Sequence, residues 1–453
     1  MDNTKNINYT KFNEQSISKY SKDDIDCFDD DDSAISFLKD KDSFRAFNIG
    51  IADTFKRKGI DIDPEDKSAM ASYLFSRLKA INATVEKETV YSWIDGSHRP
   101  KVEAGSRKRI YEICFALNLN TEETIWFFQH VYYDRAFNCH TIEEAVFYFA
   151  FSNGLSYKEA LEIINIVNDA DAPAGTNYEG NYTRFIQKRI KSMNSTDELI
   201  PFLIANRENF KAWNKTAGKT LKKLADEIIL PARSKPKVDK LKRMVSRYQS
   251  AKDHYKNSSK TPSIYEEIRP EDYKDCGLIV REIIFDSIYD NYDLSQYEYI
   301  KELMSNNNYT KISALLRHLL TTSEGTQKAD YIPYIVRNNF PTKKIISDLL
   351  SEEKISTSRS YDSIRKMIIL LDFYRFWVNI KLSSKNDSCM SLSKEDQTKT
   401  YIEETDACLY DCGYENLYVG NPYDWIFLCA ANSDEPLVFF KAYFSELLPE
   451  QQV

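Results

Sequence analysis

Apolar residues recur every three or four positions along most of this chain, a spacing that predicts helices. The first clear case is Phe44, Phe47, Ile51 and Phe55, a run that ends at Gly59. The same reading predicts helices over 67–80, 84–95, 106–117, 121–131, 142–151 and 157–167. The alternation typical of strands is nowhere sustained, and 12 Gly and 13 Pro are few for a sandwich or barrel. The expected fold class is all-α and multi-lobed.

With 453 residues the chain is too long for a single compact core. Residues 1–33 are polar, end in an acidic run, and are expected to form a flexible tail. A helical domain is expected over 34–168, followed by a loop over 169–181. A basic helical middle domain is expected over 182–335, and a C-terminal helical domain over 336–453.

Two distant segments share a layout, which indicates an internal repeat. Residues 90–161 and 345–444 each contain a short helix, an Arg-Lys pair that leads an apolar helix, an aromatic turn and further helices. The alignment pairs members of the two segments as follows: Arg107-Lys108 with Arg365-Lys366, Phe115 with Phe373, Tyr133 with Tyr414, Phe137 with Tyr418, and Ile142 with Tyr423. The C-terminal domain is therefore expected to be a divergent copy of the first.

The segment VYSWIDGSHRP and the helix that follows it carry the most specific pattern in the chain. Val90, Trp93, Gly96 and Pro100 are followed by an apolar helix with Ile110, Ile113 and Leu117. Over residues 68–125 the sequence resembles the lambda-repressor-like helix-turn-helix family of bacterial and phage regulators. That resemblance implies a short recognition helix that ends at Gly96 and enters the major groove of DNA.

The resemblance also implies which side chains would contact DNA. Base edges would be met by the residues at the start and outer face of the recognition helix, and phosphates by those that follow it. The first group is Thr84, Lys87, Thr89 and Tyr91, and the second is Ser97, His98, Arg99, Lys101, Arg107 and Lys108.

Some features depart from the family pattern and keep a second interpretation open. Asn82 stands where the family has its turn glycine, while Glu86 and Glu88 place negative charge where DNA would lie. The second copy lacks the Trp, Gly and Pro, so its contact with DNA is expected to be weaker or absent. The helix-turn-helix fold could instead serve packing or partner contacts.

Charge is distributed unevenly around a net value of −8. Residues 207–260 hold 16 Lys or Arg against 5 acids, while 386–453 hold 13 acids against 3 bases. A local basic surface can bind a polyanion even on an acidic protein. The expected contacts with a nucleic-acid backbone are Lys222, Lys223, Arg233, Lys235, Lys237, Lys240, Lys242, Arg243 and Arg247.

Catalytic, metal and cofactor chemistry find little support in the sequence. None of the five His lies in a metal-binding motif, and no phosphate loop, dinucleotide fingerprint or nucleophile elbow is present. The neighbours of Cys139-His140 and of Cys408 and Cys412 are apolar or aromatic. The eight Cys are expected to be reduced thiols. We therefore expect no catalytic residues, no metal and no cofactor, and a cytoplasmic protein without a membrane span.

Three classes of function remain. The first is a DNA-binding regulator that uses the helix-turn-helix module and the basic segment, with nucleic acid as partner, DNA before RNA, and a protein partner or homodimer in addition. The second is a helical interaction protein, an inhibitor or adaptor acting on a nucleic-acid enzyme in phage–host conflict. A structural or replication accessory with non-specific binding is a third.

Overall fold

The computed structural model describes residues 46–100, 104–139, 141–171, 182–207, 209–211, 213–229, 276–289, 299–301, 361–383, 393–418 and 421–447, with single residues between 239 and 319. Every regular element in these ranges is a helix and none is a strand, which confirms the all-α prediction. The expected acidic tail, the loop over 172–181 and the start of the second copy lie outside the described residues. Among the residues described, no helix is both long and apolar enough to cross a membrane.

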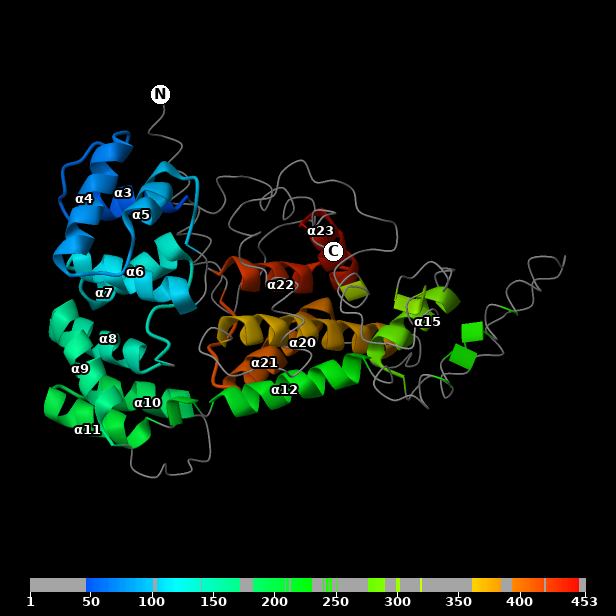
Figure 1. Cartoon of the computed structure of the whole chain (residues 1–453). Coiled ribbons are helices and arrows are strands. Elements are labelled where there is room, and N and C mark those ends of the chain that lie inside the picture. Colours follow the sequence, from blue (N-terminus) through cyan, green and yellow to red (C-terminus); the bar gives the residue numbers. More distant parts are fainter. Residues whose placement is uncertain are drawn as a thin grey trace.

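The first half of the chain folds around one hydrophobic core (Figure 1). Phe47 lies edge-on to Trp93 and to Phe127, with ring centroids 5.7 and 6.3 Å apart. These contacts join the first, third and fifth described helices. The helices of this half are α3 (Phe47–Arg57), α4 (Lys67–Ala80), α5 (Lys87–Asp95), α6 (Ala104–Ala116), α7 (Thr121–Phe127), a π-helical turn (Phe128–Tyr132), α8 (Ile142–Asn153), α9 (Tyr157–Asp169), α10 (Tyr182–Lys191) and α11 (Thr196–Asn206).

Local sequence sets the ends of these helices. Gly59 and Gly96 have φ of +67° and +84°, the left-handed conformation that stops a helix and that glycine adopts without steric cost. Asn82, in the turn between α4 and α5, has φ of +54°. Asparagine tolerates this conformation better than other non-glycine residues. An asparagine at position 82 is therefore compatible with a tight turn between α4 and α5.

The second core lies beside the first and is centred on the long helix α20 (Figure 1). Phe373 of α20 contacts the rings of Tyr401, Phe427 and Phe440 at centroid distances of 5.5, 5.3 and 5.0 Å. The helices of this half are α12 (Trp213–Ile229), α15 (Leu278–Tyr289), α20 (Tyr361–Ser383), α21 (Lys394–Asp411), α22 (Pro422–Asn432) and α23 (Pro436–Leu447).

The expected middle domain does not have a core of its own in the part of it that is described. Helices α10 and α11 pack in the first core through Ile186, Ile190 and Leu199. Helix α12 packs along α20 in the second core through Leu221 and Ile228. The boundary between the two packed units therefore falls between α11 and α12. Helix α11 contains no Lys or Arg, whereas α12 is lysine-rich and amphipathic, so this boundary coincides with a change in composition inside the expected middle domain.

A buried charge network joins three helices of the second core. The Glu282 carboxylate on α15 accepts hydrogen bonds from the Tyr374 hydroxyl and, at 2.9 Å, from Lys441 Nζ, and lies 2.9 Å from His318 Nε2. Burial raises the pKa of Glu282, but Lys441 and His318 outweigh it and hold that pKa well below its ordinary value. The network links α15, α20 and α23 through buried polar and charged side chains. It lies inside the core and does not face solvent.

In each half of the protein an arginine in the first turns of one helix pairs with a carboxylate at the third position of a later helix, and the internal repeat stays a prediction. Arg107, in the first turns of α6, pairs with Glu144, the third residue of α8, at 2.7 Å. Arg365, in the first turns of α20, pairs with Asp424, the third residue of α22, through two bonds of 2.7 Å. In each half the arginine thus spans from the helix before the aromatic turn to the helix after it.

Candidate nucleic-acid interface

Helices α4 and α5 form the helix pair that the resemblance places at DNA. Val90, Trp93 and Ile94 bury one face of α5 in the first core. The opposite side is open, since Glu86, Lys87 and Glu88 at its first turn are all exposed. A helix held in this way presents its N-terminal turn to a partner, which is how recognition helices meet a groove.

The predicted contact residues of this module divide by exposure. Lys87, Ser97, His98 and Lys108 are exposed, and Thr89 is half-buried on α5. Lys101 lies outside the described residues. These side chains remain available to a partner, whereas four others, namely Thr84 (itself exposed), Tyr91, Arg99 and Arg107, make contacts within the protein.

Arg107 does not lie at the surface, so the expectation that it contacts phosphate is wrong. Its side chain is 5% exposed and forms ion pairs with Asp134 and Glu144. Burial lowers the pKa of its guanidinium, but Glu144 and Asp134 raise that pKa well above the ordinary value. The basic run at 107–109 suggested a cationic surface, yet residue 107 falls on the inner face of α6, one residue before the exposed Lys108.

Arg99 is also used inside the protein. Its Nη2 donates to the Val131 carbonyl at 2.8 Å, and its guanidinium lies over the Tyr133 ring at 4.9 Å. It therefore connects the segment after α5 to the aromatic turn, and is half-buried. Arg99 would have to lose both interactions in order to make the predicted contact with phosphate.

Thr84 and Tyr91 have internal partners as well. The Thr84 hydroxyl and amide both donate to the buried Glu112 carboxylate, at 2.9 and 3.2 Å. This anchor holds residue 84 to α6 before α5 begins, so the predicted start of the helix at 84 is three residues early. Tyr91 shares a hydrogen bond of 2.8 Å with Ser72 of α4, and Lys87 lies over its ring. Neither residue is placed as a free reader of base edges.

The basic segment is described only in part. Lys222 and Lys223 are exposed on α12, Arg243 is exposed and Lys242 is half-buried. The other predicted backbone contacts lie outside the described residues, namely Arg233, Lys235, Lys237, Lys240 and Arg247. Lys219 is exposed one turn before Lys222 and Lys223, so the face of α12 opposite its buried side carries three lysines, followed one turn later by Asp226 and Glu227. We call these lysines the cationic stripe of α12.

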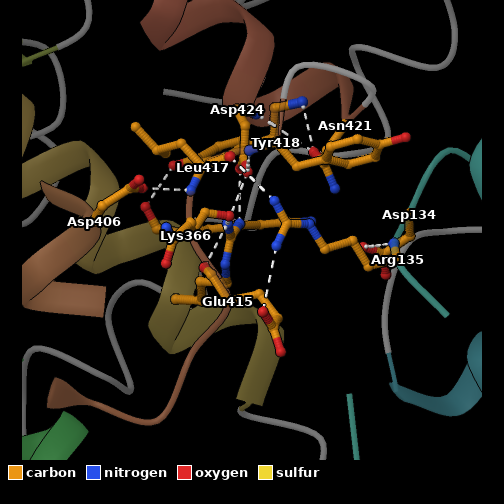
Figure 2. Close-up of polar contacts among 12 residues, drawn as sticks. Asp134, Arg135, Lys366, Asp406, Glu415, Leu417, Tyr418, Asn421 and Asp424 are labelled. Atoms are coloured by element: carbon orange, nitrogen blue, oxygen red, sulfur yellow. Dashed lines mark hydrogen bonds and ion pairs between the residues drawn. The ribbon is translucent and has the colours of Figure 1, made fainter. Parts of the chain in front are cut away.

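The aromatic turns of the two halves lie against each other (Figure 2). Arg135 of the first turn reaches Glu415 of the second at 3.3 Å, donates to the Leu417 carbonyl at 3.2 Å, and lies over the Tyr418 ring at 5.0 Å. Tyr133 itself is 3% exposed and packs with the residues of the second core. We call these contacts of Tyr133 and Arg135 the inter-unit clasp.

A cavity of about 30 Å³ lies beside the clasp and is lined by charged and polar residues together with Tyr418. Asp362 at the start of α20 lines it, is 8% exposed, and has one carboxylate oxygen without a hydrogen-bond partner. Burial, with smaller contributions from Asp134 and Glu144, raises the pKa of Asp362 to about 6 against the opposing effect of Arg107 and Lys366. The space suffices for one or two water molecules.

Arg135 and Glu415 of the clasp and Asp362 of the adjoining cavity were not among the predicted site residues. The repeat alignment contained a signal for them, because it placed Tyr133 opposite Tyr414 and Phe137 opposite Tyr418. Matching turns that carry large aromatic residues and opposite charges are candidates for an interface between two copies. What the alignment could not indicate is that the two turns meet.

Comparison with family models, with curated proteins and with solved structures finds no significant match to this chain. Within the described residues, no group of three or more His, Cys, Asp or Glu side chains is arranged to hold a metal ion.

Proposed function

We propose that the protein is a nucleic-acid-binding regulatory protein, with DNA preferred to RNA, in which α5 reads the duplex and α12 contacts its backbone. The observation that carries the proposal is the setting of α5. One face of α5 is fixed in the core through Trp93, and the helix ends at Gly96. Its first turn, which carries Lys87, is exposed. The contact set is narrower than the sequence implied, and consists of Lys87, Thr89, Ser97, His98 and Lys108 together with the cations of α12.

The test uses the full chain and a duplex that carries the region upstream of its own gene, compared with a scrambled duplex of equal length. Lys87→Glu should abolish the preference for the upstream duplex, because it reverses a charge at the first turn of the reading helix. Lys158→Glu is the matched control, since Lys158 is exposed on α9, away from α5. Equal affinity of the wild-type protein for both duplexes would refute sequence-specific reading.

A second candidate function rests on one observation. Glu86, Glu88 and Asp95 are exposed around α5, so negative charge flanks the reading helix. These acidic side chains repel a phosphate backbone and are complementary to a basic protein surface. Under this proposal the chain is an interaction protein, an inhibitor or adaptor of a nucleic-acid enzyme. Recovery of one stoichiometric protein partner from nuclease-treated extract, with no binding to duplex, would favour it over the regulator.

A further inference from the structure

The two halves of the proposed nucleic-acid interface belong to different packed units. Helix α5 is fixed in the first core through Val90 and Trp93, and α12 in the second core through Leu221 and Ile228. A ligand that contacts both at once needs the two units held at a fixed separation and orientation. The contacts between the units therefore bear directly on binding.

The inter-unit clasp is suited to that role. Arg135 makes three different contacts with a single turn of the second unit: an ion pair with Glu415, a hydrogen bond to the Leu417 carbonyl and a contact with the Tyr418 ring. A guanidinium is planar, and its donors have fixed directions, so simultaneous contacts restrict rotation as well as distance. Tyr133, two residues earlier, inserts into the second core and prevents sliding.

The clasp is also connected to the reading helix. Arg99, three residues after Gly96, donates to the Val131 carbonyl and lies over the Tyr133 ring. The segment 131–135 therefore contacts the exit of α5 on one side and the second unit on the other. The Arg99 side chain therefore connects the clasp to the segment that follows α5.

We propose that Arg135 is a positioning residue that holds α5 and the cationic stripe of α12 in one rigid arrangement, so that a long duplex engages both. This inference rests on the proposed function, since it concerns how the two parts of that interface act together. Arg135 itself would not touch the nucleic acid. The two contacts are already intramolecular, and the contribution of Arg135 is to fix the separation and orientation at which the second one forms, which raises its effective concentration without any new contact with the ligand.

The experiment compares two duplexes, one of about one helical turn and one of about four turns. Arg135→Ala should weaken binding to the long duplex about tenfold or more and leave binding to the short one within about twofold, because only the long duplex bridges both units. Exchanging the charges in Arg135→Glu with Glu415→Arg should recover only part of the lost affinity, because it restores the ion pair but neither the hydrogen bond to Leu417 nor the contact with the Tyr418 ring. Lys58→Ala is the matched control, because it breaks the Lys58–Glu123 pair, which is about as exposed and lies within the first unit.

Hydrogen exchange of the turn over 413–418 reports the clasp without any ligand. It should accelerate in Arg135→Ala and return part of the way toward the wild-type rate in the charge-exchanged protein. Faster exchange with unchanged binding to both duplexes would overturn the role of Arg135 and leave the proposed function intact. A wild-type protein that binds neither duplex would refute the proposed function and this inference with it.

Discussion

Replacing Arg107 with methionine removes the cation from a site that holds two carboxylates and is almost closed to water. The Arg107 side chain is 5% exposed, and those of Asp134 and Glu144 are 14% and 11% exposed. Breaking a buried ion pair by removing one partner costs about 3–5 kcal/mol, because the remaining charge stays buried without compensation. Here two carboxylates are left, so the upper part of that range is expected.

Urea unfolding followed by tryptophan fluorescence measures this change, since Trp93 and Trp126 both lie in the first unit. With a denaturant slope of about 3 kcal/mol per molar, the midpoint of that unit should fall by on the order of 1 M. Lys108→Met is the control, because Lys108 is the next residue and is exposed, and it should shift the midpoint little. If Arg107→Met unfolds at the wild-type midpoint and loses only nucleic-acid affinity, the internal assignment of Arg107 is wrong.

Three further outcomes are expected. Asp362→Asn should stabilise the protein by about 2–3 kcal/mol at pH 7, because the folded pKa of about 6 lies above the model-peptide value of 3.8. The free energy of unfolding of the wild-type protein should accordingly fall as pH rises from 3.8 to about 6. Urea unfolding repeated across pH should show that the variant lacks this pH dependence. Gly50→Ala should destabilise the first unit by about 1–3 kcal/mol in thermal unfolding, since the added Cβ would lie 2.5 Å from Val131 Cγ1, and Val131→Ala should relieve the loss. Lys222→Gln with Lys223→Gln should reduce the salt slope of duplex binding by about 0.9 for each phosphate contact removed; an unchanged slope would exclude α12 from the interface.

The fold class and most helices of the first unit could be predicted because periodicity and glycine stops are local signals. Gly59 and Gly96 end their helices where expected, and Trp93 packs inward as the spacing implied. The helix after Pro100 and those at 142 and 157 also lie within a few residues of their predicted positions. These features depend on residues close in sequence, so one chain suffices to find them.

The contact residues were less predictable, because exposure depends on tertiary packing. In the run Arg107-Lys108-Arg109 the sequence gives no reason to separate one cation from the others, yet Arg107 is buried and the other two are exposed. Its acidic partners stand 27 and 37 residues away. The same holds for Arg135 and Glu415, which are 280 residues apart. Ion pairs at that separation leave no periodic pattern.

The expected middle domain is divided between the two cores, and this division affects how the chain folds during synthesis. The first core draws on residues 47–210 alone, so it can close as soon as that stretch is available. Helix α12 ends at Ile229 and packs along α20, which begins at Tyr361, roughly 130 residues later. At about 5–20 residues per second the apolar face of α12 waits on the order of 10 s for its partner. Tyr133, which Arg99 of the first unit already contacts, then offers the late-forming core a docking point.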